Sequence, residues 1–265
     1  LYVGPNITLH TGAEVAEVIL EGGRAVGVMW KQGGRESIAR ADLVFLGLNA
    51  LFNPNVLLRS GDTSPLTGRR LNEQASRKMI VDFADVEGFN GGSHITGLGY
   101  MFYRGERRSR RGACLIENYN APARLRSAKG KWTSRAVVKI VAENIPEDRN
   151  QVIPGDRPIA NFEDHTDYAK KALDEVPNEF AALLERISSV EAVQVDEEIA
   201  PSEGHILGTT VMSKNPSDGV VDDLLRHHRI ANLLVGGSGA FPSGPPTNPS
   251  LTIAALSLRS ADKLA

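Results

Sequence analysis

The residues best suited to chemistry lie in the last quarter of the chain. His205 stands in a loop that follows Gly204, and an imidazole is a suitable general base near neutral pH. The alternative is a partly buried histidine whose ring bonds to the backbone, and the neighbouring residues alone favour that alternative. His205 is therefore a candidate catalytic residue with two open interpretations.

A second candidate region is a glycine-rich turn followed by a helix. The turn at 236–239, Gly-Gly-Ser-Gly, follows an expected strand over 232–235, and Asn248 leads into an expected helix over 251–264. Glycines let a ligand approach the backbone closely, and the amides and dipole at a helix start favour electron-rich groups. The spacing alone favours the alternative, an ordinary tight turn before a capped helix.

The remaining histidines and the single cysteine are expected to have no catalytic or metal-binding role. Cys114 cannot form an internal disulfide, and no group of cysteines and histidines has the spacing of a zinc site. The pair His227-His228 lies between two arginines and is expected to be solvated. The histidines without a partner at metal-ligand spacing are His10, His94 and His165.

Composition and charge exclude several classes of protein. The chain has 265 residues, of which 41 % are hydrophobic and 23 % charged, as in an ordinary globular domain. Its 30 Lys and Arg against 32 Asp and Glu give a net charge of -2, so no overall field points to nucleic acid or an anionic membrane. The most apolar stretch, 43–52, is too short for a membrane span, and no signal-peptide pattern is visible. The sequence therefore leaves the compartment unknown.

A basic run over 104–111 is the strongest local concentration of charge. Apart from Tyr103 no aromatic residue interleaves with it, so stacking on nucleic-acid bases is not expected. A solvated loop is the favoured interpretation, and a docking surface for an acidic partner is the second.

Apolar periodicity predicts an α/β (α+β) fold in which strands and helices position these residues. Residues 7–46 indicate a β-meander with turns at 21–23 and 32–34, and its last run, 43–46, is expected to be a strand buried on both faces. Further expectations are a helix over 54–61, strands and loops over 79–104, a strand over 136–142 and a helix over 168–187 with Asp167 as N-cap.

Four separated segments, in order along nearly the whole chain, closely resemble glucose–methanol–choline (GMC) oxidoreductases. The most specific segment is the tail, whose matching parts are 204–212, 220–222, 232–242 and 247–253. Its Thr-Asn-Pro-Ser-Leu-Thr ending looks most like the pyranose oxidase and gluconate/fructose dehydrogenase branch of that family. The other three matching segments are 11–61, the Gly-Arg-x-Leu element at 68–74 and the loop at 143–150. The element at 68–74 ends in Glu-Gln, where Asp-His is commoner in the family.

The resemblance implies oxidation of an alcohol, a sugar or polyol being the favoured substrate, with FAD as cofactor. In that family a histidine takes the hydroxyl proton while the carbon gives a hydride to the flavin. His205 occupies the histidine position, and Asn248 that of the residue that hydrogen-bonds the substrate oxygen. No metal is implied. The positions implied to contact FAD are Val15, Asn49, Ala50, Gly237, Ser238, Gly239, Asn248, Pro249, Ser250 and Thr252.

One departure from the family concerns the cofactor clamp. The family's N-terminal Gly-x-Gly-x-x-Gly unit, which holds the FAD pyrophosphate, is absent, and the Gly-Leu-Gly at 97–99 lacks the third glycine. We expect residues 1–74 and 202–265 to form the rest of an FAD domain and 75–201 to form a substrate domain. A catalytically silent fragment or subunit, which needs a companion chain carrying that unit, is the alternative. An electron-acceptor protein is a further expected partner.

Overall fold

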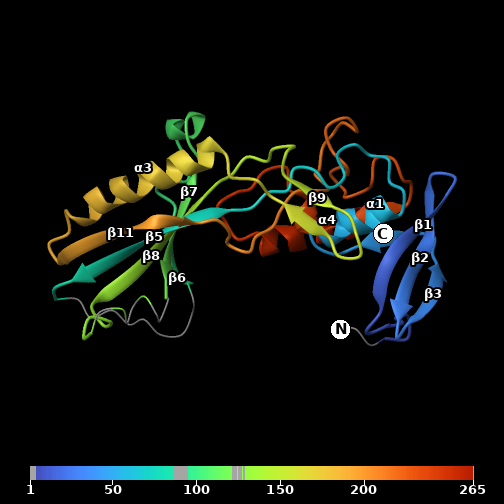
Figure 1. Ribbon diagram of the computed structural model, residues 1–265, viewed down its shortest axis with the longest axis horizontal. Helices are drawn as coiled ribbons and strands as arrows, with labels where there is room; N and C mark the ends of the chain where they lie inside the picture. Colours follow the sequence, from blue (N-terminus) through green and yellow to red (C-terminus); the bar gives the residue numbers. More distant parts are fainter. Residues whose placement is uncertain (1–3, 86–94, 121–123, 125–126, 128, 265) are drawn as a thin grey trace.

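The computed structural model describes residues 4–85, 95–120, 124, 127 and 129–264. Figure 1 shows an elongated molecule in which one large sheet lies at one end and a smaller three-stranded sheet at the other. The expected loop at 86–94, which includes His94, lies outside the described residues.

The smaller end is built around a β-meander and a two-stranded parallel sheet. The strands β1 (Glu14–Glu21), β2 (Arg24–Gln32) and β3 (Arg35–Arg40) pair antiparallel in sequence order. β4 (Val44–Leu46) pairs in parallel with β12 (Leu233–Val235), so the two ends of the chain share one core. Two helices complete this end, α1 (Phe52–Arg59) and α4 (Ser250–Leu264).

The larger sheet forms a second core. Its strand order is β11-β5-β8-β7-β6, and α3 (Asp167–Leu184) contributes buried residues to the same apolar cluster. Cys114 and Ile116 belong to this cluster, whereas the side chain of Leu115 between them points to the other face, as strand alternation requires. The strands are β5 (Ala75–Phe83), β6 (Ile95–Gly99), β7 (Cys114–Tyr119), β8 (Arg135–Ala142) and β11 (Val190–Ala200).

Short elements connect the two ends. The hairpin of β9 (Gln151–Ile153) and β10 (Ile159–Asn161) lies between them in Figure 1. Two single-turn 3₁₀ helices cover Glu106–Ser109 and Ser238–Ala240.

The mixed fold is confirmed, and several local expectations are wrong. The first strand begins at Glu14 rather than residue 7, and α1 begins at Phe52 because Asn49 Oδ1 accepts the backbone N–H groups of Leu51 and Phe52. The N-cap of α3 is Thr166, not Asp167, because the Thr166 hydroxyl accepts the N–H of Ala169.

The strand at 43–46 is not buried on both faces. Val44 and Leu46 point into the core, but Phe45 is 50 % exposed and Leu43 is 53 % exposed. β12 is the only strand that pairs with β4 in the described part of the chain, and α4 covers the outer face only partly. An open apolar surface therefore remains beside α4.

The expected solvation of His227 is also wrong. Its ring is fully buried, and Nδ1 accepts the backbone N–H groups of Arg229 and Ile230. Nε2 lies 3.3 Å from the Asp62 carboxylate. Burial alone would raise the pKa of Asp62, but hydrogen bonds from His227 and Thr67 outweigh it, so this pKa lies below its usual value. Asp62 lies far away in the sequence, so no local pattern revealed this pair.

The basic run is exposed as expected, except at one residue. Arg111 is 3 % exposed and makes ion pairs with Glu175 and Glu179 of α3. Arg107 also pairs with Glu179, and Arg108 pairs with Glu143. Three arginines of the run are thus paired within the chain, and the docking surface for an acidic partner stays a prediction.

The packing of α3 predicts where the larger end is sensitive to truncation. Leu173 is fully buried, so Leu173→Ala should lower the free energy of unfolding by about 2–5 kcal/mol. Leu183, on the same helix, is 43 % exposed, and Leu183→Ala should change it by less than about 1 kcal/mol. Urea denaturation followed by circular dichroism measures both. Equal losses in the two variants would contradict this assignment of the core.

Candidate active site

Three stretches that are distant in sequence meet around His205. Asn72 and Leu207 form a short antiparallel bridge in which each N–H donates to the other's carbonyl, at 2.9 and 2.8 Å. Asn144 and Gly244 form a second bridge, at 2.9 and 3.0 Å. The Asn72 side-chain NH₂ donates to the backbone carbonyl of Asn144, and the Asn144 NH₂ donates to Asn72 Oδ1, so the two bridges are joined. The loop of His205 is thus held from both sides.

Glu73 fixes the backbone of the His205 loop. Its carboxylate is buried, and one oxygen accepts the N–H groups of His205, at 3.1 Å, and Gln74, at 2.7 Å. The other oxygen accepts the hydroxyl of Ser202 at 2.9 Å. The carboxylate therefore replaces contacts that the loop would otherwise make with water.

Gln74 fixes the His205 ring. The Gln74 side-chain NH₂ donates to two backbone carbonyls, those of Pro245 and Thr247 (2.9 Å to the latter). Its carbonyl oxygen lies 2.7 Å from His205 Nδ1. A flipped amide would set its oxygen against two carbonyl oxygens, so the network assigns the amide orientation. Nδ1 must then carry the hydrogen, which leaves the Nε2 lone pair free to take a proton.

Two residues near this junction have left-handed backbones. Arg70 has φ 64° and Thr209 has φ 76°, which is unfavourable for residues that carry a Cβ. The Thr209 hydroxyl donates to the carbonyl of Ala50 at 2.6 Å, and its own carbonyl accepts the N–H of Gly68 at 2.7 Å. These bonds maintain the strained turn after His205.

The glycine turn brings segments of the chain together. A Cβ on Gly237 (φ 95°) would lie 2.7 Å from the carbonyl oxygen of Leu48. A Cβ on Gly239 would lie 2.3 Å from the hydroxyl of Thr210. Internal contacts therefore account for both glycines, and the expected approach of FAD to this turn stays a prediction, as it does for Ser238.

The first three expected FAD contacts have structural roles as well. Asn49 caps the start of α1, Ala50 is fully buried, and Val15 is a partly buried residue of β1 that packs on the smaller core. Contact with a cofactor at these positions is untested.

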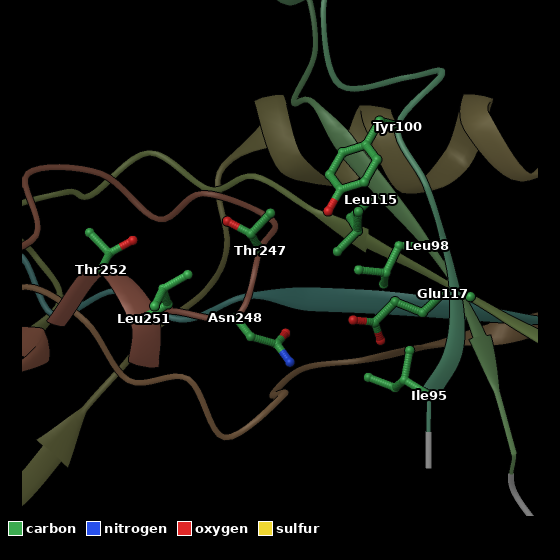
Figure 2. A pocket seen from close by; sticks show the side chains of 10 residues that line it. Ile95, Leu98, Tyr100, Leu115, Glu117, Thr247, Asn248, Leu251 and Thr252 are labelled. Carbon is green, nitrogen blue, oxygen red and sulfur yellow. The ribbon is translucent and has the colours of Figure 1, made fainter. Parts of the chain in front are cut away.

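A cavity of about 750 Å³ lies between the start of α4 and the large sheet, and Asn248 points into it (Figure 2). Thr247, Leu251 and Thr252 line the same side. His205 is not a lining residue, but Gln74 connects its ring to the carbonyl of Thr247. The Gln74 side chain thus links the His205 ring to Thr247, the residue that precedes Asn248. The opposite wall consists of Ile95, Gly97, Leu98, Tyr100, Leu115 and Glu117.

Pro249 directly precedes α4, and residues 250–252 form the first turn of that helix. Pro249 is buried, and its carbonyl accepts the N–H of Ile253 at 3.0 Å. The N–H groups of the first turn, including Ser250 and Thr252, precede that bond and have no helical partner. They offer donors to an electron-rich group beside the cavity.

Glu117 was missed by sequence reasoning. Its side chain is 1 % exposed and lies 2.8 Å from the ammonium of Lys139, which is also 2.6 Å from Glu203. Burial alone would lower the pKa of Lys139, but the two carboxylates have the larger effect, so this pKa lies above its usual value. The sequence signal that could have revealed this ion pair is one charged residue in each of two apolar segments, Glu117 in β7 and Lys139 in β8, because paired strands can bring such charges together.

Within the residues that the structure describes, no cluster of three or more metal-binding side chains occurs. In the same residues, no helix has the length and apolar character that crossing a membrane requires. Gly97 and Gly99 lie in β6, a strand at the edge of the large sheet, rather than in a strand–helix turn.

Comparison with known proteins establishes the family. A family model described as GMC oxidoreductase matches residues 124–257, about half of the chain, and the chain belongs to that family. The fructose dehydrogenase large subunit of Gluconobacter japonicus is 43 % identical over 60 residues, 23 % of this chain and 11 % of that protein. The 2-methyl-1,2-propanediol dehydrogenase of Mycolicibacterium austroafricanum is 23 % identical over 96 % of this chain and 53 % of its own length.

Solved structures share the fold. Pyridoxine 4-oxidase from Mesorbium loti superposes with a TM-score of 0.74 and 19 % identity, covering 98 % of this chain and 58 % of its own. A formate oxidase structure from Aspergillus oryzae, concerned with FAD modification, has a TM-score of 0.70 and 17 % identity, covering 97 % and 60 %. The family resemblance is confirmed and agrees with the expectation of FAD. The chain spans little more than half the length of these structures.

The Gln74 network predicts the protonation of His205. In neutral His205 the hydrogen should reside on Nδ1, which ¹⁵N-histidine NMR spectra distinguish from protonation at Nε2. Gln74→Leu removes the acceptor, so the Nε2-protonated form should become populated. His165, whose Nε2 bonds the Pro201 carbonyl, serves as an internal reference that should not change. An Nε2-protonated His205 in the unaltered protein would contradict the assignment.

Proposed function

We propose that this chain is part of an FAD-dependent oxidoreductase that oxidises the CH–OH group of an alcohol, most suitably a sugar or polyol. The observation that carries the proposal is the hydrogen bond from His205 Nδ1 to Gln74, which leaves Nε2 as a proton acceptor. Family membership supports the reaction class, and the names of the fructose and propanediol dehydrogenases support the substrate class.

The residues beside the cavity fit the flavin end of FAD. The free N–H groups at the start of α4, together with Asn248 and Thr252, offer hydrogen-bond donors to its electron-rich ring edge. The proposed further contacts are Val15, Asn49, Ala50, Gly237, Ser238, Gly239, Pro249 and Ser250. When bound, FAD would accept the hydride from the alcohol carbon.

The chain's own residues would handle the proton. The substrate O–H donates to His205 Nε2, and as the C–H bond breaks the proton passes to the imidazole. The Asn248 amide donates to the substrate oxygen and holds it in place. Glu73 and Gln74 keep the ring stationary, so little reorganisation precedes proton transfer.

The two cores support the proposed division of the chain. Residues of the smaller core come from 18–57 and 220–240, and those of the larger core from 75–176. We assign 1–74 and 202–265 to the FAD domain and 75–201 to the substrate domain.

A second proposal is a chain that is silent until a companion segment or chain supplies the FAD pyrophosphate unit. The open apolar surface at Leu43, Phe45 and α4 favours it, because such a surface beside a two-stranded sheet is suited to further packing. Titration with FAD distinguishes the two: tight binding by this chain alone supports the first, and weak or no binding supports the second.

Removal of the proposed base gives a direct test. In the flavin-loaded protein, His205→Ala should slow flavin reduction by an alcohol about a hundred- to ten-thousandfold while flavin binding is largely kept. Anaerobic stopped-flow absorbance near 450 nm measures the rate. His228→Ala is a matched control, because that ring bonds the carbonyl of Ser213, away from the His205 network. Unchanged reduction in His205→Ala would refute the catalytic role.

A further inference from the structure

We propose that Glu117 accepts a hydrogen bond from a second hydroxyl of the substrate, so that the cavity selects diols and polyols over simple alcohols. The inference rests on the proposed function, since it concerns the substrate of the same site. It adds a specificity-determining residue on the wall that faces Asn248.

The sheet register brings Glu117 to the cavity. In the paired strands Leu98 lies opposite Glu117, and Glu117 opposite Lys139. This row lies on the face opposite to the cluster that contains Ile116 and α3. Figure 2 shows the Glu117 carboxylate and the Asn248 amide pointing toward each other across the cavity.

The walls around Glu117 are apolar. Ile95, Leu98 and Leu115 line the same wall, and Glu117 is the single charged residue among the described residues that line the cavity. A carboxylate in such a wall forms stronger hydrogen bonds than one in water, because solvent does not compete. It can only accept, so it selects a ligand group that donates.

The paired lysine favours a neutral donor. Lys139 lies 2.8 Å from Glu117, and the Tyr119 ring lies 4.8 Å from the same ammonium, which holds a positive charge at this point of the wall. Lys139 already balances the Glu117 charge, so a ligand ammonium would gain less there than at an unpaired carboxylate, whereas a neutral hydroxyl can donate without a new charge pair. Glu203 also pairs with Lys139 and accepts a hydrogen bond from the Ser76 hydroxyl, but it is not among the residues that line the cavity.

The cavity is large enough for such a substrate beside a flavin ring. Its volume of about 750 Å³ exceeds what a small alcohol occupies. On the sheet side, the described lining residues with a polar side chain are Tyr100 and Glu117, and of these only the Glu117 carboxylate is restricted to accepting. Glu117 supplies a second anchoring point at that wall.

The test compares matched substrates in the flavin-loaded protein. D-sorbitol and 1,2-, 1,4- and 1,6-hexanediol are assayed against 1-hexanol, with anaerobic flavin reduction as the readout. In Glu117→Gln, the ratio of kcat/KM for the best diol to that for 1-hexanol should fall about ten- to a hundredfold. Glu203→Gln, which removes the other partner of Lys139, should leave this ratio unchanged.

A binding measurement separates the role of Glu117 from its part in the fold. Sorbitol should raise the melting temperature of the unaltered protein more than that of Glu117→Gln, since only bound ligand stabilises. Glu117→Asp keeps the charge beside Lys139, so it should fold like the unaltered protein and still lose the diol preference.

The outcomes that overturn the inference are distinct from those that overturn the proposed function. An unchanged ratio in Glu117→Gln, or an equal fall in Glu203→Gln, would show that Glu117 is structural. A preference of the unaltered protein for 6-amino-1-hexanol over every diol would show that the site takes a cation. If no alcohol reduces the flavin, the proposed function fails, and the inference fails with it.

Discussion

The Gln74 side-chain amide is the contact on which the candidate site depends. It accepts from the His205 ring and donates to the carbonyls of Pro245 and Thr247, so one group sets the position of two loops. An amide is suited to this task because one planar group carries both donors and an acceptor. Glu73 adds the second restraint by binding the backbone N–H of His205. Together these adjacent residues give the imidazole one position and, when it is neutral, one tautomer.

Both ends of the molecule contribute to this arrangement. The larger sheet supplies Glu117 on one wall of the cavity, paired with Lys139 behind it, and the loop before α4 supplies Asn248 on the other wall. The bridges through Asn72 and Asn144 fasten the loops between these walls. The tight turn after His205 requires a left-handed backbone at Thr209, which is unfavourable in free energy. The hydrogen bond from the Thr209 hydroxyl to the carbonyl of Ala50 offsets part of this strain. The cavity therefore forms where the two cores meet.

Sequence patterns predicted the parts of this fold whose signals are local. The meander, the glycine turn and the helix after Asn248 follow from periodicity and turn residues, and the tail motif indicated the family. Contacts between distant residues were not readable. His227 was expected to be solvated because its partner Asp62 lies far upstream, and the Glu73-Gln74 pair was noted only as a departure from a commoner sequence. Phe45 was expected to be buried because an apolar run does not reveal how many strands cover it.

The most direct measurement is the visible absorption spectrum of the protein with FAD, recorded without oxygen before and after addition of a polyol. We expect flavin absorption near roughly 370 and 450 nm, as for oxidised flavins in general, and bleaching of the longer-wavelength band by sorbitol or a sugar. That result would show that the geometry around His205 and Asn248 supports hydride transfer. Bound flavin that stays oxidised with every alcohol tested would contradict the central claim.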